Sequence, residues 1–195
     1  NFSQEYIQVP FLSTTPKIDG VLDNELKQIQ KRAFNYIWQF DNPPTDTVPV
    51  HYIVGYTPSH FYIYIETHSD SIIFRDRGSS NGDGFKLLFA IPQKDSLTDE
   101  FYNLCFSPSE KNNYWARQKI WDFNTRTVLW NFSNETLFEY KSQNGKCGFE
   151  ALISWNDIPP YHPWILPETG FNLYFAKAIG DTITNGYAVV HDYGI

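Results

Sequence analysis

The sequence has no methionine, only two cysteines and no excess of basic residues among its 195 positions. Its 15 lysines and arginines stand against 22 aspartates and glutamates, which gives a formal net charge of −7. That sign is opposite to what binding to a nucleic-acid backbone requires, so nucleic acid is excluded as a partner. No apolar run approaches the roughly 20 residues of a membrane-spanning helix, since the longest, Phe61–Ile65, ends at Glu66. The sequence therefore predicts no membrane span.

Cys105 and Cys147 are too few for a disulfide framework or a zinc site. We expect both to be free, buried side chains in strands, with one disulfide between them as the alternative. The chain begins at Asn1 without an initiator methionine or an apolar leader. We therefore expect a processed or trimmed N-terminus, from which any signal peptide has already been removed.

The high content of aromatic residues is the most informative feature of the composition. They make up 18% of a composition that is 42% hydrophobic and 19% charged. Such a composition is typical of a packed globular protein, and the length fits a single domain over residues 1–195. Aromatic side chains favour strands and also form flat stacking platforms.

Hydrophobic residues alternate with period two along much of the chain. Val50–Tyr56 and Phe61–Glu66, joined by a Thr-Pro-Ser turn, indicate a β-hairpin. Further strands are expected at Glu5–Val9, Gly84–Ile91, Glu100–Phe106, Asn113–Lys119, Thr127–Asn131, Leu137–Lys141, Lys146–Ser154, Phe171–Ile179 and Tyr187–His191. About eleven short strands predict an all-β fold, an antiparallel β-sandwich that is jelly-roll-like, with one short helix.

The short helix is expected near the start of the chain. Asp23 is a suitable N-cap for a segment from Asn24 to about Lys31. Its apolar residues Leu26 and Ile29 lie on one side, so we expect the helix to close one end of the sandwich.

Four segments stand in an order that is more specific than any one of them alone. They are Ile18–Leu26, with an Ile-Asp-Gly turn before the short helix; the hairpin Val50–Glu66; the strand Gly82–Phe89; and the late strands Gly148–Trp155 and Gly170–Ala176, which lead to His191–Ile195. Together they resemble carbohydrate-binding module family 9 and its Bacteroidetes-type relatives over nearly the whole chain.

The resemblance implies a β-sandwich that binds carbohydrate without catalysis, in an exported system that uses or degrades polysaccharides. It also implies a periplasmic or cell-surface location and a glycoside hydrolase on another chain as a partner. Family members clamp a terminal sugar between two Trp rings, one of them just before the position of Asp83. Here Ser79, Ser80 and Asn81 occupy that stretch and Lys86 replaces a Glu, so the sugar-binding rings are expected elsewhere.

The segment Asn112–Phe123 concentrates what sugar recognition needs: flat rings for the C–H faces and planar polar groups for the hydroxyls. In an unbroken strand, one face carries Trp115, Arg117, Lys119 and Trp121. We predict that Trp115 and Trp121 stack on sugar rings, while Arg117 and Gln118 bind hydroxyls. The alternative is that both rings belong to the core, although two cations on the same face argue against complete burial.

Two further tryptophans are second candidates for sugar binding. Trp38 and Trp164 lie beside proline-rich segments, which are expected to form loops. Trp155, in contrast, continues a predicted strand and is expected in the core.

Acidic residues between positions 70 and 83 make a structural calcium ion a candidate cofactor, as the family resemblance also implies. Calcium takes six to eight oxygen ligands, and Asp70, Asp76 and Asp83 supply carboxylates. Arg75 and Arg77 add competing positive charge, so solvated loop acids are the alternative interpretation.

Catalysis has little support in the sequence. The carboxylates that could form an acid–base pair have no recognisable spacing; they are Glu66, Asp83, Glu100, Glu139 and Glu150. A glycosidase acting on O-glycosyl bonds, or a subunit associated with one, is kept as the alternative function. A haem-binding redox domain of the DOMON type is a further alternative, which the lack of methionine disfavours. Two N-glycosylation sequons, residues 131–133 and 134–136, are interpreted as surface polarity.

Overall fold

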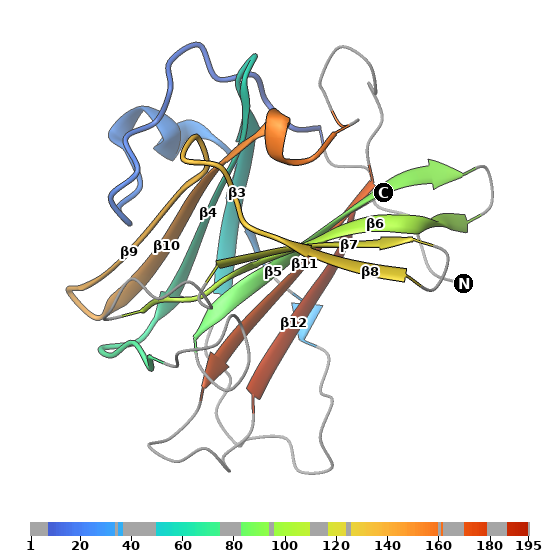
Figure 1. Ribbon diagram of the computed structural model, residues 1–195. Coiled ribbons are helices and arrows are strands. Elements are labelled where there is room, and N and C mark those ends of the chain that lie inside the picture. The colour runs from blue at the N-terminus through green and yellow to red at the C-terminus, as the bar shows by residue number, and fades with distance from the viewer. Residues whose placement is uncertain are drawn as a thin grey trace.

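A computed structural model describes residues 8–33, 35–36, 50–74, 83–93, 96–109, 117–123, 126–159, 161, 170–178 and 187–194. This part of the chain forms two antiparallel sheets (Figure 1). The first sheet has five strands in the order β1-β3-β4-β10-β9, and the second has seven in the order β2-β12-β11-β5-β6-β7-β8. The predicted antiparallel β-sandwich is confirmed.

The strand bounds follow the alternation seen in the sequence. The five-stranded sheet contains β1 (Arg32–Ala33), β3 (Val50–Tyr56), β4 (His60–His68), β9 (Leu137–Gln143) and β10 (Lys146–Ser154). The seven-stranded sheet contains β2 (Asn35–Tyr36), β5 (Gly84–Gln93), β6 (Ser96–Phe106), β7 (Arg117–Phe123), β8 (Arg126–Trp130), β11 (Gly170–Ala178) and β12 (Tyr187–Gly194). Two 3-10 helices, η1 (Asn24–Gln28) and η3 (Trp155–Asp157), complete the elements of the described residues. None of these helices is long and apolar enough to cross a membrane.

The core between the two sheets is strongly aromatic. Its largest fully buried side chains include Tyr52, Tyr102, Phe85, Phe89, Phe106, Phe138 and Phe149. Phe61 contacts Phe89 and Trp155 edge to face, with ring centroids 5.1 and 6.0 Å apart. The indole N–H of Trp155 donates a hydrogen bond to the carbonyl oxygen of Thr57 at 3.2 Å. The prediction that Trp155 belongs to the core is therefore confirmed.

The N-terminal segment covers the outer side of the five-stranded sheet, beside which Figure 1 shows it in blue. A second apolar cluster forms there, made of Leu12, Leu22, Leu26, Ile53, Tyr62, Tyr64 and Leu152. The expectation that the helix closes an end of the sandwich is wrong, because Leu26 packs on the face of the sheet. The helix also ends at Gln28, and the Asp23 carboxylate accepts a hydrogen bond from the Lys17 amide at 3.0 Å instead of capping η1.

A buried carboxylate fastens this segment to the sheet. Glu150 is fully buried, and its Oε2 accepts hydrogen bonds from the backbone amides of Asp19 and Gly20, both at 3.0 Å. Its Oε1 accepts a third hydrogen bond from the Tyr62 hydroxyl at 2.7 Å. Burial raises the pKa of Glu150, although the three hydrogen bonds oppose this shift. The Ile-Asp-Gly turn noted in the sequence is thus a structural anchor.

Both cysteines are buried and free, as expected. Cys105 lies in β6 of one sheet and Cys147 in β10 of the other. The thiol of Cys147 contacts the carbonyl oxygens of Ser69 and Ser71 at 3.3 and 3.4 Å, so it holds the chain beyond β4 against β10.

Gly20 and Gly145 offer a matched test of the anchor, because their φ angles are 75° and 74°. A Cβ atom at Gly20 would lie 2.5 Å from the Lys141 backbone nitrogen, whereas at Gly145 it would meet only Asp70 Oδ1, at 3.5 Å. We expect Gly20→Ala to lower the free energy of unfolding by about 2–4 kcal/mol and Gly145→Ala by about 1 kcal/mol. Denaturant unfolding measures both values, and equal losses would contradict the tight seating of the turn.

Candidate functional site

Strand β7 carries three of the predicted sugar-binding positions, Arg117, Gln118 and Trp121. The structure describes the strand at these positions but not their side chains. Trp115, Trp38 and Trp164 lie outside the described residues. The structure therefore describes a strand at Arg117–Phe123, which overlaps the end of the predicted strand Asn113–Lys119, and does not test which side chains contact a ligand.

The register of β7 assigns its positions to faces of the seven-stranded sheet. Position 117 pairs with Phe106, position 119 with Leu104 and position 121 with Tyr102. Directly paired positions of antiparallel strands lie on the same face, and these three partners belong to the buried core. Positions 117, 119 and 121 thus belong to the face that meets the other sheet. Position 118, which pairs with Cys105, belongs to the opposite face.

Lys119 is the residue of this face whose side chain the structure describes. It is only 7% exposed, and its Nζ lies 3.0 Å from Oδ1 of Asp157, which is 4% exposed. The expectation that the charge of Lys119 keeps this face open is wrong at that position. The ammonium group is neutralised by a buried carboxylate instead of by water.

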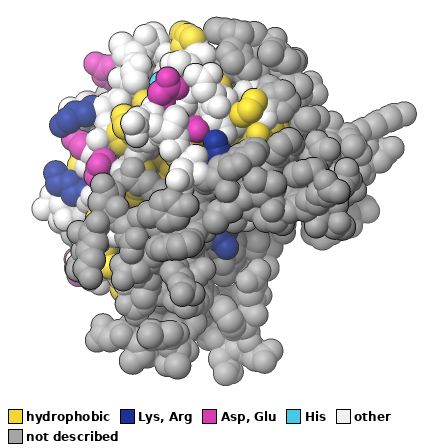
Figure 2. Space-filling model, viewed as in Figure 1, with side chains coloured by type: hydrophobic (Ala, Val, Ile, Leu, Met, Phe, Trp, Pro, Cys, Tyr) yellow, Lys and Arg dark blue, Asp and Glu magenta, His cyan; other side chains and the backbone are white. Residues whose placement is uncertain are grey.

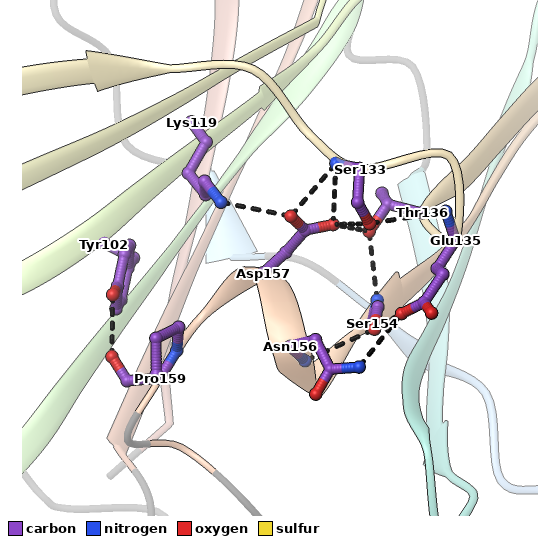
Figure 3. Close-up of polar contacts among 9 residues, drawn as sticks. All are labelled: Tyr102, Lys119, Ser133, Glu135, Thr136, Ser154, Asn156, Asp157 and Pro159. Carbon is purple, nitrogen blue, oxygen red and sulfur yellow. Dashed lines mark hydrogen bonds and ion pairs between the residues drawn. The ribbon is translucent and has the colours of Figure 1, made fainter.

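Asp157 is the centre of a buried polar network, shown in Figure 3. Besides Lys119, its carboxylate accepts hydrogen bonds from the Ser133 amide at 3.0 Å, the Ser133 hydroxyl at 2.8 Å and the Thr136 hydroxyl at 2.6 Å. Desolvation alone would raise the pKa of Asp157, but these hydrogen bonds hold it below its ordinary value. The charged form is therefore stabilised where it lies.

The network continues to the surface through β10. The Thr136 hydroxyl accepts a hydrogen bond from the Ser154 amide at 3.0 Å. The Ser154 hydroxyl donates to Oε2 of Glu135 at 2.8 Å, and the Asn156 side-chain amide donates to the same oxygen at 3.0 Å (Figure 3). These contacts join the β8–β9 connection to the start of η3. Together with the Lys119–Asp157 contact, they connect the end of β10 in the five-stranded sheet to β7 in the seven-stranded sheet.

The sequons are only partly surface features, as this network shows. Asn131 and Asn134 are exposed, in agreement with the prediction. Thr136 is buried, however, and the hydroxyls of Ser133 and Thr136 both bind Asp157. Sequence reasoning missed Asp157, whose one local signal is the Ser-x-x-Asp spacing from Ser154, which is typical of a helical start.

Three of the five carboxylates considered for catalysis, Glu66, Asp83 and Glu150, have contacts within the fold. Glu66 bonds to Lys31 and Lys146, and Glu150 holds the N-terminal turn as described above. Asp83 is 1% exposed and its Oδ2 accepts a hydrogen bond from the Ile73 amide at 2.8 Å. Glu139 is exposed on β9, and the side chain of Glu100 lies outside the described residues. The buried members of this set therefore stabilise the fold.

The two predicted calcium ligands that the structure describes, Asp70 and Asp83, differ in burial. Asp70 is exposed beside the β9–β10 turn, and Asp83 is buried against Ile73. Asp76 lies outside the described residues. Within the described ranges, no three His, Cys, Asp or Glu side chains converge as a metal site would require. The calcium ion stays a prediction that depends on the family resemblance.

Asp157→Ala is expected to lower the free energy of unfolding by about 3–5 kcal/mol, because the Lys119 ammonium would stay buried without its partner. Adding Lys119→Met should recover about 1–3 kcal/mol of that loss. Urea unfolding of the single and double variants measures this coupling.

Glu135→Ala is the matched control, because it removes an exposed carboxylate from the outer end of the same network. It should change stability little. A loss as large as that of Asp157→Ala, or no recovery in the double variant, would contradict the central role of the buried ion pair.

Comparison with known proteins gives similarity in structure but not in sequence. No protein-family model matches the chain, and no curated protein matches it. A family 9 carbohydrate-binding module from Caldicellulosiruptor kristjanssonii, solved with glucose, matches with a TM-score of 0.56 and 14% identity over 96% of this chain and 85% of that one. The cellotriose complex from the same organism gives 0.59 and 13%, over 96% and 83%. A proposed carbohydrate-binding protein from Bacteroides uniformis gives 0.67 and 11%, over 99% and 91%. The chain therefore has the fold of carbohydrate-binding module family 9 domains.

Proposed function

We propose that this protein is a non-catalytic carbohydrate-binding module. The observation that carries the proposal is the shared fold, which extends over 96% of this chain in domains solved with glucose and with cellotriose. The internal contacts of Glu66, Glu150 and Asp157 add support, since they assign these buried carboxylates to stability and leave binding as the simpler use of the surface. Fold alone does not define a site, so the binding residues are a separate part of the proposal.

The setting that we propose is an exported polysaccharide-utilisation or degradation system, in the periplasm or at the cell surface. This module would bind the polysaccharide that a glycoside hydrolase on another chain degrades. The similarity to the Bacteroides uniformis protein, over 99% of this chain, supports the comparison with a bacterial glycan-binding protein.

For the binding face we propose the segment around β7. Trp115 and Trp121 would stack on sugar rings, and Arg117 and Gln118 would bind hydroxyls from the loop or the strand edge, with Trp38 and Trp164 as the next candidates. A structural calcium ion held by Asp70, Asp76 and Asp83 belongs to the same proposal. Positions 117 and 121 pair with core residues. A substitution of Trp121 is therefore the sharpest test of whether a ring on this strand stacks on sugar or packs in the core.

Calorimetric titration of the protein with a panel of plant and host glycans tests the function. We expect at least one oligosaccharide to bind with a dissociation constant of about 1 mM or lower, an ordinary range for a shallow site of this kind. Absence of heat from every glycan at millimolar concentration would discredit the proposal. Hydrolysis that disappears on changing one carboxylate would establish the glycosidase alternative.

Trp115→Ala and Trp121→Ala test the face, with affinity and stability measured on the same samples. A stacking ring should weaken sugar binding by about 1–3 kcal/mol and leave the free energy of unfolding nearly unchanged. A loss of roughly 3–5 kcal/mol in stability would instead identify a core ring. In that case Trp38 and Trp164 become the rings to test.

A further inference from the structure

Two lysines from distant parts of the chain converge on one carboxylate oxygen. Lys31 follows η1, and Lys146 begins β10. Their Nζ atoms lie 3.2 and 3.0 Å from Oε1 of Glu66, so the two ammonium groups are within about 6 Å of one another. The second oxygen of Glu66 faces the Tyr64 hydroxyl at 3.4 Å. This arrangement brings two positive charges to one negative charge.

The lysines remain open to solvent while their shared partner is covered. The side chains of Lys31 and Lys146 are 38% and 44% exposed, whereas that of Glu66 is 12% exposed. The two lysines lower the pKa of Glu66 against the effect of desolvation, so Glu66 is charged at neutral pH. Within the described residues, Glu66 is the acid that bonds to either lysine. One unit of positive charge is therefore left uncompensated at an accessible place.

Each ammonium group also has hydrogen-bonding capacity to spare. A lysine has three N–H donors, and the contact with Glu66 accounts for one of them on each side. Two ammonium groups at this separation repel one another, and a second anion between them would relieve that repulsion. The chain as a whole has a net charge of −7, so this local excess is opposite in sign to the rest of the protein.

The surroundings are polar and are held by secondary structure. In the register of the five-stranded sheet, Glu66 pairs with His51 of β3, and Lys146 pairs with His68 of β4. His51 is partly exposed and His68 is exposed, so two imidazole groups flank the lysine pair on the outer face. Figure 2 shows acidic and basic side chains interspersed on the described part of one face of the molecule.

We propose that Lys31 and Lys146 form a site for the carboxylate of an acidic sugar on the outer face of the five-stranded sheet, separate from the segment around β7, so that the glycan class bound by this protein includes uronate-containing polysaccharides. The inference rests on the proposed carbohydrate-binding function and names its ligand class. Charge complementarity and the proposed function together select this occupant: the two oxygens of a sugar carboxylate can each accept a hydrogen bond from one of the two ammonium groups.

The test is calorimetric titration with a galacturonate oligosaccharide and with its methyl ester, which has the same sugar rings but no charge. We expect the acid to bind about tenfold more tightly than the ester at low salt, and this difference to shrink as the ionic strength rises. Lys31→Gln with Lys146→Gln should remove the difference in affinity between the acid and the ester.

Lys17→Gln with Lys27→Gln is the matched control. It removes the same number of positive charges, from exposed lysines that bond to Asp19 and Asn24 instead of Glu66. It should change affinity for the acid by less than about twofold. Glu66→Gln should change affinity in the opposite direction. Removing the internal carboxylate leaves both lysines without that partner, so affinity for the acid should rise several-fold. Thermal unfolding of every variant confirms that it is folded.

The outcomes separate the two proposals. Equal affinity for acid and ester, or a loss of acid binding in the control pair as large as in the Lys31 and Lys146 pair, would overturn the site for acidic sugars and leave carbohydrate binding standing. Weaker acid binding by a folded Glu66→Gln protein would also overturn it. Failure of both these ligands and the whole glycan panel would overturn the carbohydrate-binding function itself.

Discussion

The Asp157 carboxylate is the interaction on which the geometry of one end of the sandwich depends. The hydrophobic effect that holds the two sheets together is non-directional. A buried charge with several donors is directional: Lys119 must come from β7, and Ser133 and Thr136 from the β8–β9 connection. The carboxylate thereby sets how far β7, next to the edge strand β8, lies from the end of β10.

Glu150 and Glu66 extend the same logic to the outside of the five-stranded sheet. Tyr62, Tyr64 and Glu66 project from β4 toward the N-terminal segment, while Phe61, Ile63 and Ile65 project inward. A strand that is buried on both faces leaves its outer polar groups without water, so each carboxylate needs donors from the covering segment. Glu150 obtains backbone amides and Glu66 obtains lysines. The first arrangement is closed, whereas the second keeps cations at the surface.

Local patterns predicted the elements well, and long-range contacts account for what they missed. The alternation in Val50–Tyr56 and Lys146–Ser154 defines β3 and β10 because one face of each is fully apolar. The same alternation could not tell that β4 has a second covered face, since its outward tyrosines also suit a solvent-facing strand. Lys119 was misjudged for a related reason: a cation argues for exposure only when no buried carboxylate is near, and Asp157 lies 38 positions away. The candidate sugar site was predicted from composition, which names residue types but not the side of a strand on which a ligand approaches.

The anchoring of the Ile-Asp-Gly turn has a consequence for the order in which the chain is assembled during synthesis. The amide of Asp19 and the carboxylate of Glu150 are 131 positions apart, so the Ile-Asp-Gly turn can take its final place only after the chain through β10 has been made. Until β10 has been made and paired with β4, Leu22 and Leu26 can cover only the β3–β4 hairpin, and the Glu150 carboxylate that anchors the turn is absent. During synthesis the apolar side of this segment therefore stays unanchored until β10 has emerged, and exposed apolar surface of this kind favours aggregation of an incomplete chain.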